Sequence, residues 1–315
     1  MRIGILDPVH PIIEQRLEAA GHTCTPLHAL PDSERKQELA ATEGLVVRSR
    51  RIDAAAIDRS ARLRFIARVG AGLENIDVAH CASKGILVLN SPEGNRDGVG
   101  ETCVLLLLAL MKHLVPANRA VHNGEWPREA MRGTDLHGKT VGIIGYGNMG
   151  SAFAEKLRGF GVRILGHDKY RSGFSTTGVE ESSLDRTLAE SDVISLHLPL
   201  NPGTAHYANS AFFDRLKRPV WFLNTSRGGV VHTTALLDAL DSGRVIGAGL
   251  DVLEYERPEL DGLAPGPDRP TYDRLLRHDR VILTPHIAGV THEGKFKMAD
   301  VLATKILQHF PNGTT

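Results

Sequence analysis

Two hydrophobic patterns alternate along most of the chain. Short, continuous apolar runs without polar alternation predict strands that are buried on both faces. Stretches with apolar residues at helical spacing lie between these runs. Buried strands connected by helices are typical of a parallel sheet covered by helices, so the pattern predicts an α/β fold.

The alternation occurs twice, and each occurrence predicts one sheet. In the first third, the predicted strands are 3–6, 45–47, 65–69 and 86–89, and the predicted helices are 11–20, 53–60 and 75–84. From Thr140 onward, the six predicted strands are 141–144, 162–165, 193–196, 220–223, 245–250 and 281–283. Six strands with helical connections make a doubly wound sheet. We therefore expect two doubly wound parallel-sheet domains, and a last helix at about 293–309.

A very apolar helix is predicted at 101–113, between the two regions. A helix that is apolar all round needs cover on every side, so we expect it to pack between domains or at a subunit interface. The longest apolar run, 103–111, is half of the roughly 20 residues that cross a bilayer. The first residues also lack the apolar stretch of a signal peptide. These features predict a cytoplasmic protein without a membrane partner.

Composition narrows the function further. Lys and Arg number 37, as do Asp and Glu, so the formal net charge is zero. This balance provides no basic surface for nucleic acid, and none is expected as a partner. The three cysteines, Cys24, Cys81 and Cys103, are far apart and form no C-x-x-C pair. Neither a disulfide framework nor a metal site is therefore predicted.

A G-x-G-x-x-G motif directly follows the predicted strand 141–144 and opens a helix. Gly145 allows a tight turn, Gly147 lets the backbone approach a pyrophosphate, and Gly150 lets the helix pack close to the strand. The helix N-terminus then offers free N–H groups to phosphates. Asp168 lies 18 positions after Gly150, at the end of the next strand. A carboxylate there accepts hydrogen bonds from a ribose and favours NAD over NADP, although Lys169 and Arg171 beside it could soften that preference.

Polar residues follow several later strands. His197 follows 193–196, Arg227 comes shortly after 220–223, Asp251 follows 245–250, and His286 comes shortly after 281–283. Ligands of an open α/β sheet bind at the carboxyl ends of its strands, so these side chains are candidates for one site. Hydride transfer to a nicotinamide leaves a proton to be moved, which histidine can do near neutral pH. A guanidinium binds a carboxylate in a planar, bidentate way.

These motifs, in this order, resemble the D-2-hydroxyacid dehydrogenases over nearly the whole chain. The resemblance rests on the glycine turn with Asp168, and on three further segments: 224–229 (NTSRGG), 249–256 (GLDVLEYE) and 284–289 (TPHIAG). It implies a catalytic triad of Arg227 for the substrate, His286 as acid and base, and Glu256 as the partner of the histidine. The family usually has this glutamate directly before a proline, whereas here Arg257 intervenes, and so Glu254 and Glu259 are alternatives.

The resemblance also implies how the chain is divided and where NAD binds. Residues 1–94 and 291–315 would form a flavodoxin-like substrate domain, residues 95–290 an inserted Rossmann domain, and the cleft between them the active site. A homodimer is implied as well. The residues implied to contact NAD are Gly145, Gly147, Asn148, Met149, Gly150, Asp168, His197, Leu198, Pro199, Thr225, Ser226, Asp251, His286 and Ala288.

The substrate is suggested by two segments, 45–49 and 68–77, which resemble the substrate loops of D-3-phosphoglycerate dehydrogenases. The resemblance implies that Arg48 and Arg68 face a substrate phosphate, and Gly70 and Ala71 could offer N–H groups to its carboxylate. The first expectation is therefore oxidation of 3-phosphoglycerate to 3-phosphohydroxypyruvate, in serine biosynthesis, without a C-terminal regulatory domain. Reduction of glyoxylate, hydroxypyruvate or another 2-oxo acid is the alternative within this class. An NAD-sensing protein similar to the family's corepressors is the alternative from another class.

Overall fold

The computed structural model describes residues 1–176, 178–257, 262–264 and 266–311. The chain divides into two compact units. Unit 1 comprises Met1–Arg96, Arg257–Gly262 and Val290–Thr315, and unit 2 comprises Asp97–Glu256 and Leu263–Gly289. Each unit contains one sheet in which all strands are parallel, so the predicted class of two parallel-sheet α/β domains is confirmed.

The sheet of unit 1 has five strands. Their order across the sheet is β2 (Thr23–Thr25), β1 (Arg2–Ile5), β3 (Gly44–Val47), β4 (Phe65–Arg68) and β5 (Leu87–Asn90). Four of these were predicted from their apolar runs, to within one residue at each end. The fifth, β2, was missed because it is a short edge strand of Thr-Cys-Thr, without an apolar run.

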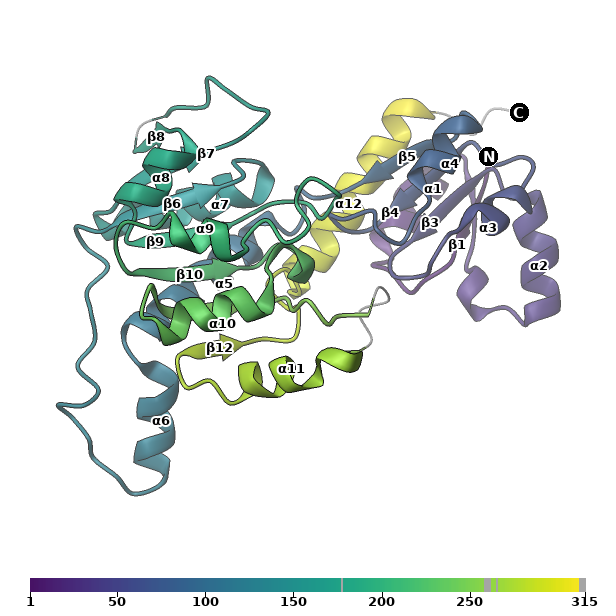
Figure 1. The fold of residues 1–315 in the computed structure, drawn as a ribbon. Helices are drawn as coiled ribbons and strands as arrows, with labels where there is room; N and C mark the ends of the chain where they lie inside the picture. Colours follow the sequence, from purple (N-terminus) through teal and green to yellow (C-terminus); the bar gives the residue numbers. More distant parts are fainter. Residues whose placement is uncertain (177, 258–261, 265, 312–315) are drawn as a thin grey trace. The chain divides into compact units, whose positions relative to one another are not determined.

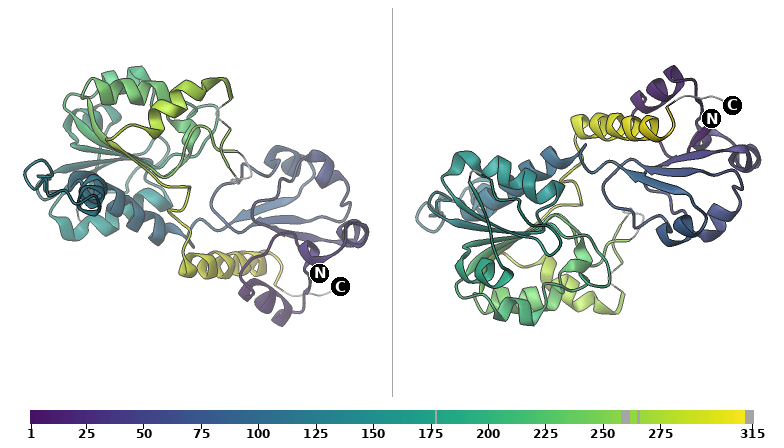
Figure 2. Two further views of the ribbon diagram at one scale, coloured as in Figure 1. Left: turned by 90° about the horizontal axis from the view of Figure 1, so that it is seen from below. Right: turned by 90° about the horizontal axis from the view of Figure 1, so that it is seen from above.

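Helices cover both faces of this sheet (Figures 1 and 2). On one face, α1 (Ile12–Ala19) and α12 (His292–His309) pack together through buried residues that include Leu17 and Leu302. The other face is covered by the 3₁₀ turn η1 (Leu27–Ala29) with α3 (Ala54–Asp58) and α4 (Val78–Ser83). Helix α2 (Asp32–Ala41) was not predicted, because it buries no side chain and has no apolar stripe.

The sheet of unit 2 has seven strands, where six were predicted. Their order is β12 (Val281–Leu283), β11 (Val245–Leu250), β10 (Val220–Asn224), β9 (Val193–Leu196), β6 (Thr140–Ile144), β7 (Arg163–His167) and β8 (Val179–Glu181). The missed strand, β8, is a polar edge strand of Val-Glu-Glu. The chain runs from β6 outward to β8, and then returns to β9 on the other side of β6. This reversal makes the carboxyl ends of β6 and β9 the topological switch point, where ligands of such sheets bind.

Two helical layers enclose this sheet (Figure 2). One layer consists of α8 (Leu184–Glu190), α9 (Ser210–Asp214), α10 (Thr233–Asp241) and α11 (Arg269–Leu276). The other consists of α5 (Arg96–Met111), α7 (Asn148–Lys156) and the 3₁₀ turn η2 (Leu157–Phe160). Helix α5 corresponds to the predicted apolar helix, and its Cys103 and Leu107 are fully buried in the core of unit 2.

Helix α6 (Leu114–His122) projects from the sheet of unit 2 in Figure 1. It leaves Leu114, Val115 and Val121 about half exposed. Among the described residues, no single helix has the length and apolar character needed to span a membrane. Only α5 and α6 taken together reach that length and composition, and a bend of 62° separates them.

Candidate functional site

The glycine motif forms the turn between β6 and α7. Gly145 has a left-handed φ of 92°, and a Cβ on it would lie 2.4 Å from the carbonyl oxygen of His197. A Cβ on Gly150 would lie 2.1 Å from the carbonyl oxygen of Gly145. By contrast, a Cβ on Gly147 would meet no atom within 4 Å, and no side chain caps α7 at this residue. The first and third glycines are thus required by the fold, whereas the space above the second is open to a ligand.

Asp168 is joined to this turn by hydrogen bonds. Its Oδ2 accepts the N–H of Tyr146 at 2.8 Å, and its Oδ1 accepts the N–H groups of Tyr170 and Arg171 at 2.9 and 3.0 Å. The Arg171 guanidinium donates to the carbonyl of Tyr146 at 2.6 Å. The carboxylate therefore lies beside the glycine turn, as the sequence predicts, and it also organises the backbone there.

His197 follows β9, and its carbonyl oxygen lies next to Gly145. Its Nε2 is 2.9 Å from Oγ of Ser195, whereas its Nδ1 is buried and has no hydrogen-bond partner. Burial lowers the pKa of His197 to about 3, so the ring is neutral at physiological pH. A buried polar atom without a partner, beside the open turn, fits the predicted cofactor contact. The next two residues, Leu198 and Pro199, were also predicted to contact NAD. Leu198 packs against the core of unit 2, and the Pro199 carbonyl accepts the Thr204 hydroxyl.

The segment after β10 is shaped by Asn224, whose side chain is fully buried. Its Oδ1 accepts the N–H and hydroxyl of Ser226 at 3.1 and 2.7 Å, and its Nδ2 donates to the Arg227 carbonyl at 3.0 Å. The Thr225 hydroxyl lies 3.2 Å from Sγ of Cys103, whose thiol pKa is raised to about 12 by burial. Thr225 and Ser226, both predicted to contact NAD, are buried and hydrogen-bonded within the protein.

Arg227 leaves this turn half-buried, and its Nη1 donates to the Ser226 carbonyl at 2.6 Å. The 3₁₀ turn η3 (Gly228–Val230) follows it directly. A Cβ on Gly228 would lie only 1.9 Å from the carbonyl oxygen of Leu253, in the segment after β11. The chain after Arg227 is thereby packed against the segment that leads to Glu256.

Asp251 holds the segment after β12. Its carboxylate is fully buried and accepts the Thr284 hydroxyl at 2.6 Å and the N–H groups of Ile287 and Ala288 at 2.8 Å each. Its carbonyl accepts the N–H of His286 at 2.7 Å. Burial raises the pKa of Asp251 above the usual range of a carboxyl group. Both Asp251 and Ala288 were predicted to contact NAD, and here they are bonded to each other.

His286 is the centre of this arrangement. Its backbone is left-handed, with φ of 56°, and its Nδ1 lies 2.8 Å from Oε2 of Glu256. The other oxygen of Glu256 accepts the N–H of Leu253 at 2.8 Å. Of the alternative glutamates, Glu254 is bonded to His206 instead, and Glu259 lies outside the described residues. The structure therefore pairs the histidine with Glu256, despite the inserted Arg257.

Unit 1 contains four of the five residues predicted to bind the substrate, Arg48, Arg68, Gly70 and Ala71, whereas Arg227 lies in unit 2. Arg68 donates from Nε to the Arg48 carbonyl at 3.1 Å and from Nη1 to the Gly72 carbonyl at 2.6 Å. The Arg48 guanidinium is exposed and makes no hydrogen bond or ion pair with any residue in the described part of the chain. The N–H of Gly70 donates to Ser91 Oγ at 3.2 Å, and the Ala71 carbonyl accepts from Asn90 at 2.6 Å.

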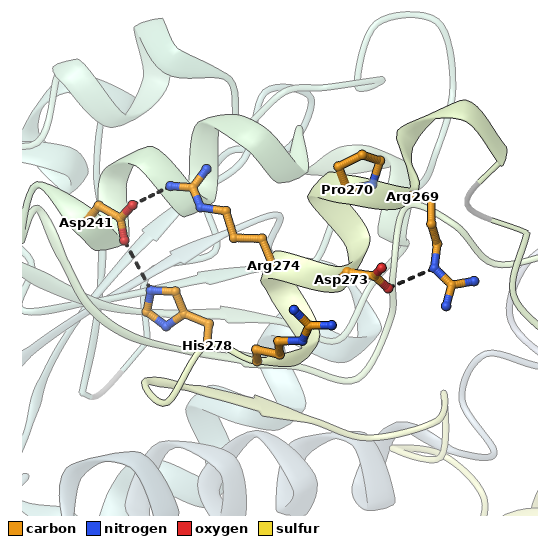
Figure 3. A pocket seen from close by; sticks show the side chains of 7 residues that line it. Asp241, Arg269, Pro270, Asp273, Arg274 and His278 are labelled. Atoms are coloured by element: carbon orange, nitrogen blue, oxygen red, sulfur yellow. Dashed lines mark hydrogen bonds and ion pairs between the residues drawn. The ribbon is translucent and has the colours of Figure 1, made fainter.

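A pocket lies elsewhere, against α10 and α11 (Figure 3). Its volume is about 710 Å³, and charged side chains dominate its lining. Within it, Arg269 is paired with Asp273, and both Arg274 and His278 are paired with Asp241. None of the predicted site residues lines this pocket, and its own acidic groups neutralise most of its cations.

Two side chains that organise these segments, Asn224 and Asp7, were not predicted as site residues. Glu254 was predicted only as an alternative to Glu256, and its bonds to His206 and Thr233 were not. In unit 1, Asp7 Oδ2 accepts the N–H groups of Arg48, Ser49 and Arg50 at 2.7, 3.1 and 3.2 Å. Asp7 comes directly after the first predicted strand, so the rule that flagged Asp251 could have found it.

Comparison with known proteins identifies the family of this chain. Residues 104–288 match the family model described as D-isomer specific 2-hydroxyacid dehydrogenase, NAD binding domain. The chain is 35% identical to a hydroxypyruvate reductase of Thermotoga maritima, over 98% of this chain and 97% of the relative. It is also 35% identical to a D-3-phosphoglycerate dehydrogenase of Archaeoglobus fulgidus, over 86% of this chain but only 50% of that relative.

A solved structure, D-lactate dehydrogenase from Aquifex aeolicus complexed with NAD and lactic acid, superimposes with a TM-score of 0.81. Its sequence is 29% identical, and the match covers 99% of this chain and 95% of that one. The chain therefore belongs to the D-isomer specific 2-hydroxyacid dehydrogenases, and its residues 104–288 form the NAD-binding part.

Proposed function

We propose that this protein interconverts a D-2-hydroxy acid and the corresponding 2-oxo acid with NAD. The observation that carries the proposal is the hydrogen bond between His286 and Glu256. Both residues follow strands of the sheet of unit 2, at the same edge, formed by the carboxyl ends of its strands, as the glycine turn. A histidine held by a carboxylate can move the proton that accompanies a hydride. The open space over Gly147 and the unpartnered Nδ1 of His197 support the cofactor assignment.

Each member of the proposed triad has a separate task. NAD, when bound, would accept the hydride during oxidation, and its reduced form NADH would supply the hydride during reduction. Arg227 binds the substrate carboxylate and polarises the adjacent carbonyl. His286 takes the hydroxyl proton during oxidation at Nε2 and returns it during reduction. Glu256 fixes the ring orientation through Nδ1 and stabilises the imidazolium.

For the substrate, we propose 3-phosphoglycerate, which would place the enzyme in serine biosynthesis. The exposed guanidinium of Arg48 supports this choice, because a phosphate dianion would satisfy it. The bonds that Arg68 and Asp7 make to the Arg48 carbonyl and N–H would hold the backbone from which that guanidinium extends. In this proposal Arg48 binds the phosphate directly, whereas Arg68 acts largely through the loop.

The test is to compare kcat/KM for 3-phosphoglycerate oxidation with kcat/KM for hydroxypyruvate and glyoxylate reduction. Arg48→Gln should lower kcat/KM for the phosphorylated acid by about 100-fold and change that of glyoxylate by less than about threefold. Equal effects on both acids would contradict a phosphate role for Arg48. Efficient reduction of hydroxypyruvate without turnover of 3-phosphoglycerate would replace the proposed substrate.

Reduction of hydroxypyruvate or glyoxylate is the second candidate. The hydrogen bonds of Arg68 favour it, because this guanidinium, which was predicted to face a phosphate, already donates to two backbone carbonyls. The relative named hydroxypyruvate reductase also matches over almost its whole length, in contrast to the phosphoglycerate dehydrogenase. A protein that binds NAD but turns over none of these acids would instead support a sensing function.

We further propose that the protein is a cytoplasmic homodimer. The exposed apolar residues of α6, together with Leu105 on α5 and Trp126, support a subunit interface on unit 2. Light scattering of the purified protein should give a mass near twice 34.2 kDa. Val115→Glu combined with Val121→Glu should yield a monomer, because each substitution would place an unpaired charge in an apolar contact.

A further inference from the structure

Glu254, two residues before Glu256, is fully occupied by hydrogen bonds. Its Oε1 lies 2.5 Å from Nε2 of His206, and its Oε2 accepts the N–H and hydroxyl of Thr233 at 2.9 and 2.7 Å. Its side chain is only 20% exposed. A carboxylate with this many partners fixes the position of the segment that carries it.

His206 lies in the loop after β9 and has an unusual backbone conformation. Its φ is 49°, in the left-handed region, and its N–H donates to the Gly229 carbonyl at 2.8 Å. Its ring also packs edge-on against the ring of His232, with 4.9 Å between centroids. A non-glycine residue in this region is held there by its surroundings, and here those are the Gly229 carbonyl and the Glu254 carboxylate.

The His206–Glu254 pair thereby joins three segments that carry proposed site residues. The loop that contains His206 begins at His197, Gly229 belongs to the turn that follows Arg227, and Glu254 belongs to the segment that ends at Glu256. Within that last segment, the N–H of Glu256 bonds to the Leu253 carbonyl and the N–H of Leu253 bonds to the Glu256 carboxylate. A shift of Glu254 therefore moves the carboxylate that holds His286.

We propose that His206 and Glu254 are positioning residues, which hold the 253–256 turn so that Glu256 orients His286. The inference rests on the proposed function of Glu256 and His286. Neither positioning residue needs to touch substrate or cofactor. Removing the pair should lower kcat by about 10-fold to 100-fold, since a displacement of a catalytic group by about 1 Å has an effect of this size.

His206→Gly is the most informative variant. Glycine adopts a positive φ without strain and keeps the N–H bond to Gly229, so only the imidazole is lost. We expect kcat to fall by at least about 10-fold, while the Kd of NAD changes by less than about threefold and the Tm stays within about 2 °C. Glu254→Ala should lower kcat at least as much, and it should also lower the Tm, because Thr233 loses its acceptor. The double variant should show no further loss of kcat beyond Glu254→Ala, because both changes break the same pair.

Glu254→Gln serves as the matched control. The amide retains an acceptor for Thr233 and can donate to the histidine ring, so most of kcat should be retained. Unchanged kcat in His206→Gly, or a loss of kcat that parallels a loss of folded protein, would overturn the proposal.

Amide hydrogen exchange provides a readout that does not depend on turnover. In His206→Gly, exchange should accelerate in 253–256 and remain unchanged in β6 and α7. Unchanged exchange in 253–256 would refute the positioning role even for a protein that turns over none of the acids. Faster exchange without any wild-type turnover would instead show that the pair holds the turn and that the proposed reaction is wrong.

Discussion

Oε2 of Glu256 lies 2.8 Å from Nδ1 of His286, so in the proposed mechanism the other ring nitrogen, Nε2, is the one that moves the proton. Glu256→Gln should keep the contact but lose the charge that stabilises an imidazolium. We expect kcat to fall by about 10-fold to 100-fold, with little change in the Kd of NAD measured by fluorescence titration. Full activity in the Glu256→Gln variant would argue against an electrostatic role for this pair.

His286→Asn should abolish turnover, with a loss of about 1,000-fold or more in kcat. Asparagine tolerates the left-handed φ of 56° better than most residues, so the backbone of the loop should remain as it is. NAD should still bind, and circular dichroism should show an unchanged fold. Substantial residual turnover would show that another group moves the proton.

The second and third glycines of the turn should respond differently to the same added methyl group. Gly147→Ala should leave the free energy of unfolding nearly unchanged, because its Cβ would meet no atom within 4 Å. It should nevertheless weaken NAD binding by about 10-fold or more, since the methyl group occupies the ligand's approach. Gly150→Ala should destabilise the protein by about 3 kcal/mol, because its Cβ would collide with the Gly145 carbonyl. Urea unfolding of the cofactor-free proteins and NAD titration separate the two effects, and equal destabilisation by both would contradict the geometry.

Asp251→Ala should disrupt the loop that carries His286. It leaves the N–H groups of Ile287 and Ala288 and the Thr284 hydroxyl without their acceptor. We expect a loss of about 2 to 4 kcal/mol in stability and a fall in kcat larger than that of Asp251→Asn, which retains one acceptor. Urea unfolding and steady-state kinetics of both variants provide the check, and identical kcat values would contradict a role in holding His286.

His197 should make the protein sensitive to acid. Burial lowers its pKa to about 3 in the folded state, whereas in the unfolded chain it has the ordinary value of 6.5. The unfolded state therefore binds the proton first as pH falls. The stability contributed by the neutral ring is fully present above about pH 6.5 and is lost as pH falls toward 3, at about 1.4 kcal/mol per pH unit. Urea unfolding between about pH 7 and 4.5 should show this slope.

The control for this prediction is the His197→Asn variant, because the asparagine side chain does not titrate in this pH range. It should reduce the pH dependence of unfolding by about 1.4 kcal/mol per unit below about pH 6. The same slope in both proteins would place the acid-sensitive group elsewhere.

The buried parts of the fold were predictable from the sequence, for a physical reason. Strands such as β9 and β11 are buried on both faces, so they are continuous apolar runs, and their bounds were predicted without error. Edge strands β2 and β8 bury only part of their side chains, and α2 buries none. Without a requirement for burial, such segments have no hydrophobic pattern by which they can be recognised.

The candidate site was predictable to a similar extent. Residues that directly follow a strand, such as Asp251, stand out in the sequence because the strand itself is recognisable. The His206–Glu254 pair could not be predicted, since it joins residues 48 positions apart on two irregular segments. The hydrogen bonds from Arg68 to two backbone carbonyls could not be predicted either, because the sequence shows that a guanidinium is present but not what it binds.

In unit 2, the segments that carry the proposed chemistry leave one sheet at the same edge, after their last paired residues. Replacements at the exposed positions of these loops therefore leave the strand pairing intact, whereas buried loop residues such as Leu253 and Ala288 belong to the apolar layers. Such a scaffold lets evolution or an engineer exchange substrate preference one loop at a time, which accords with relatives of one architecture that bear the names of different 2-oxo acid reductases and dehydrogenases.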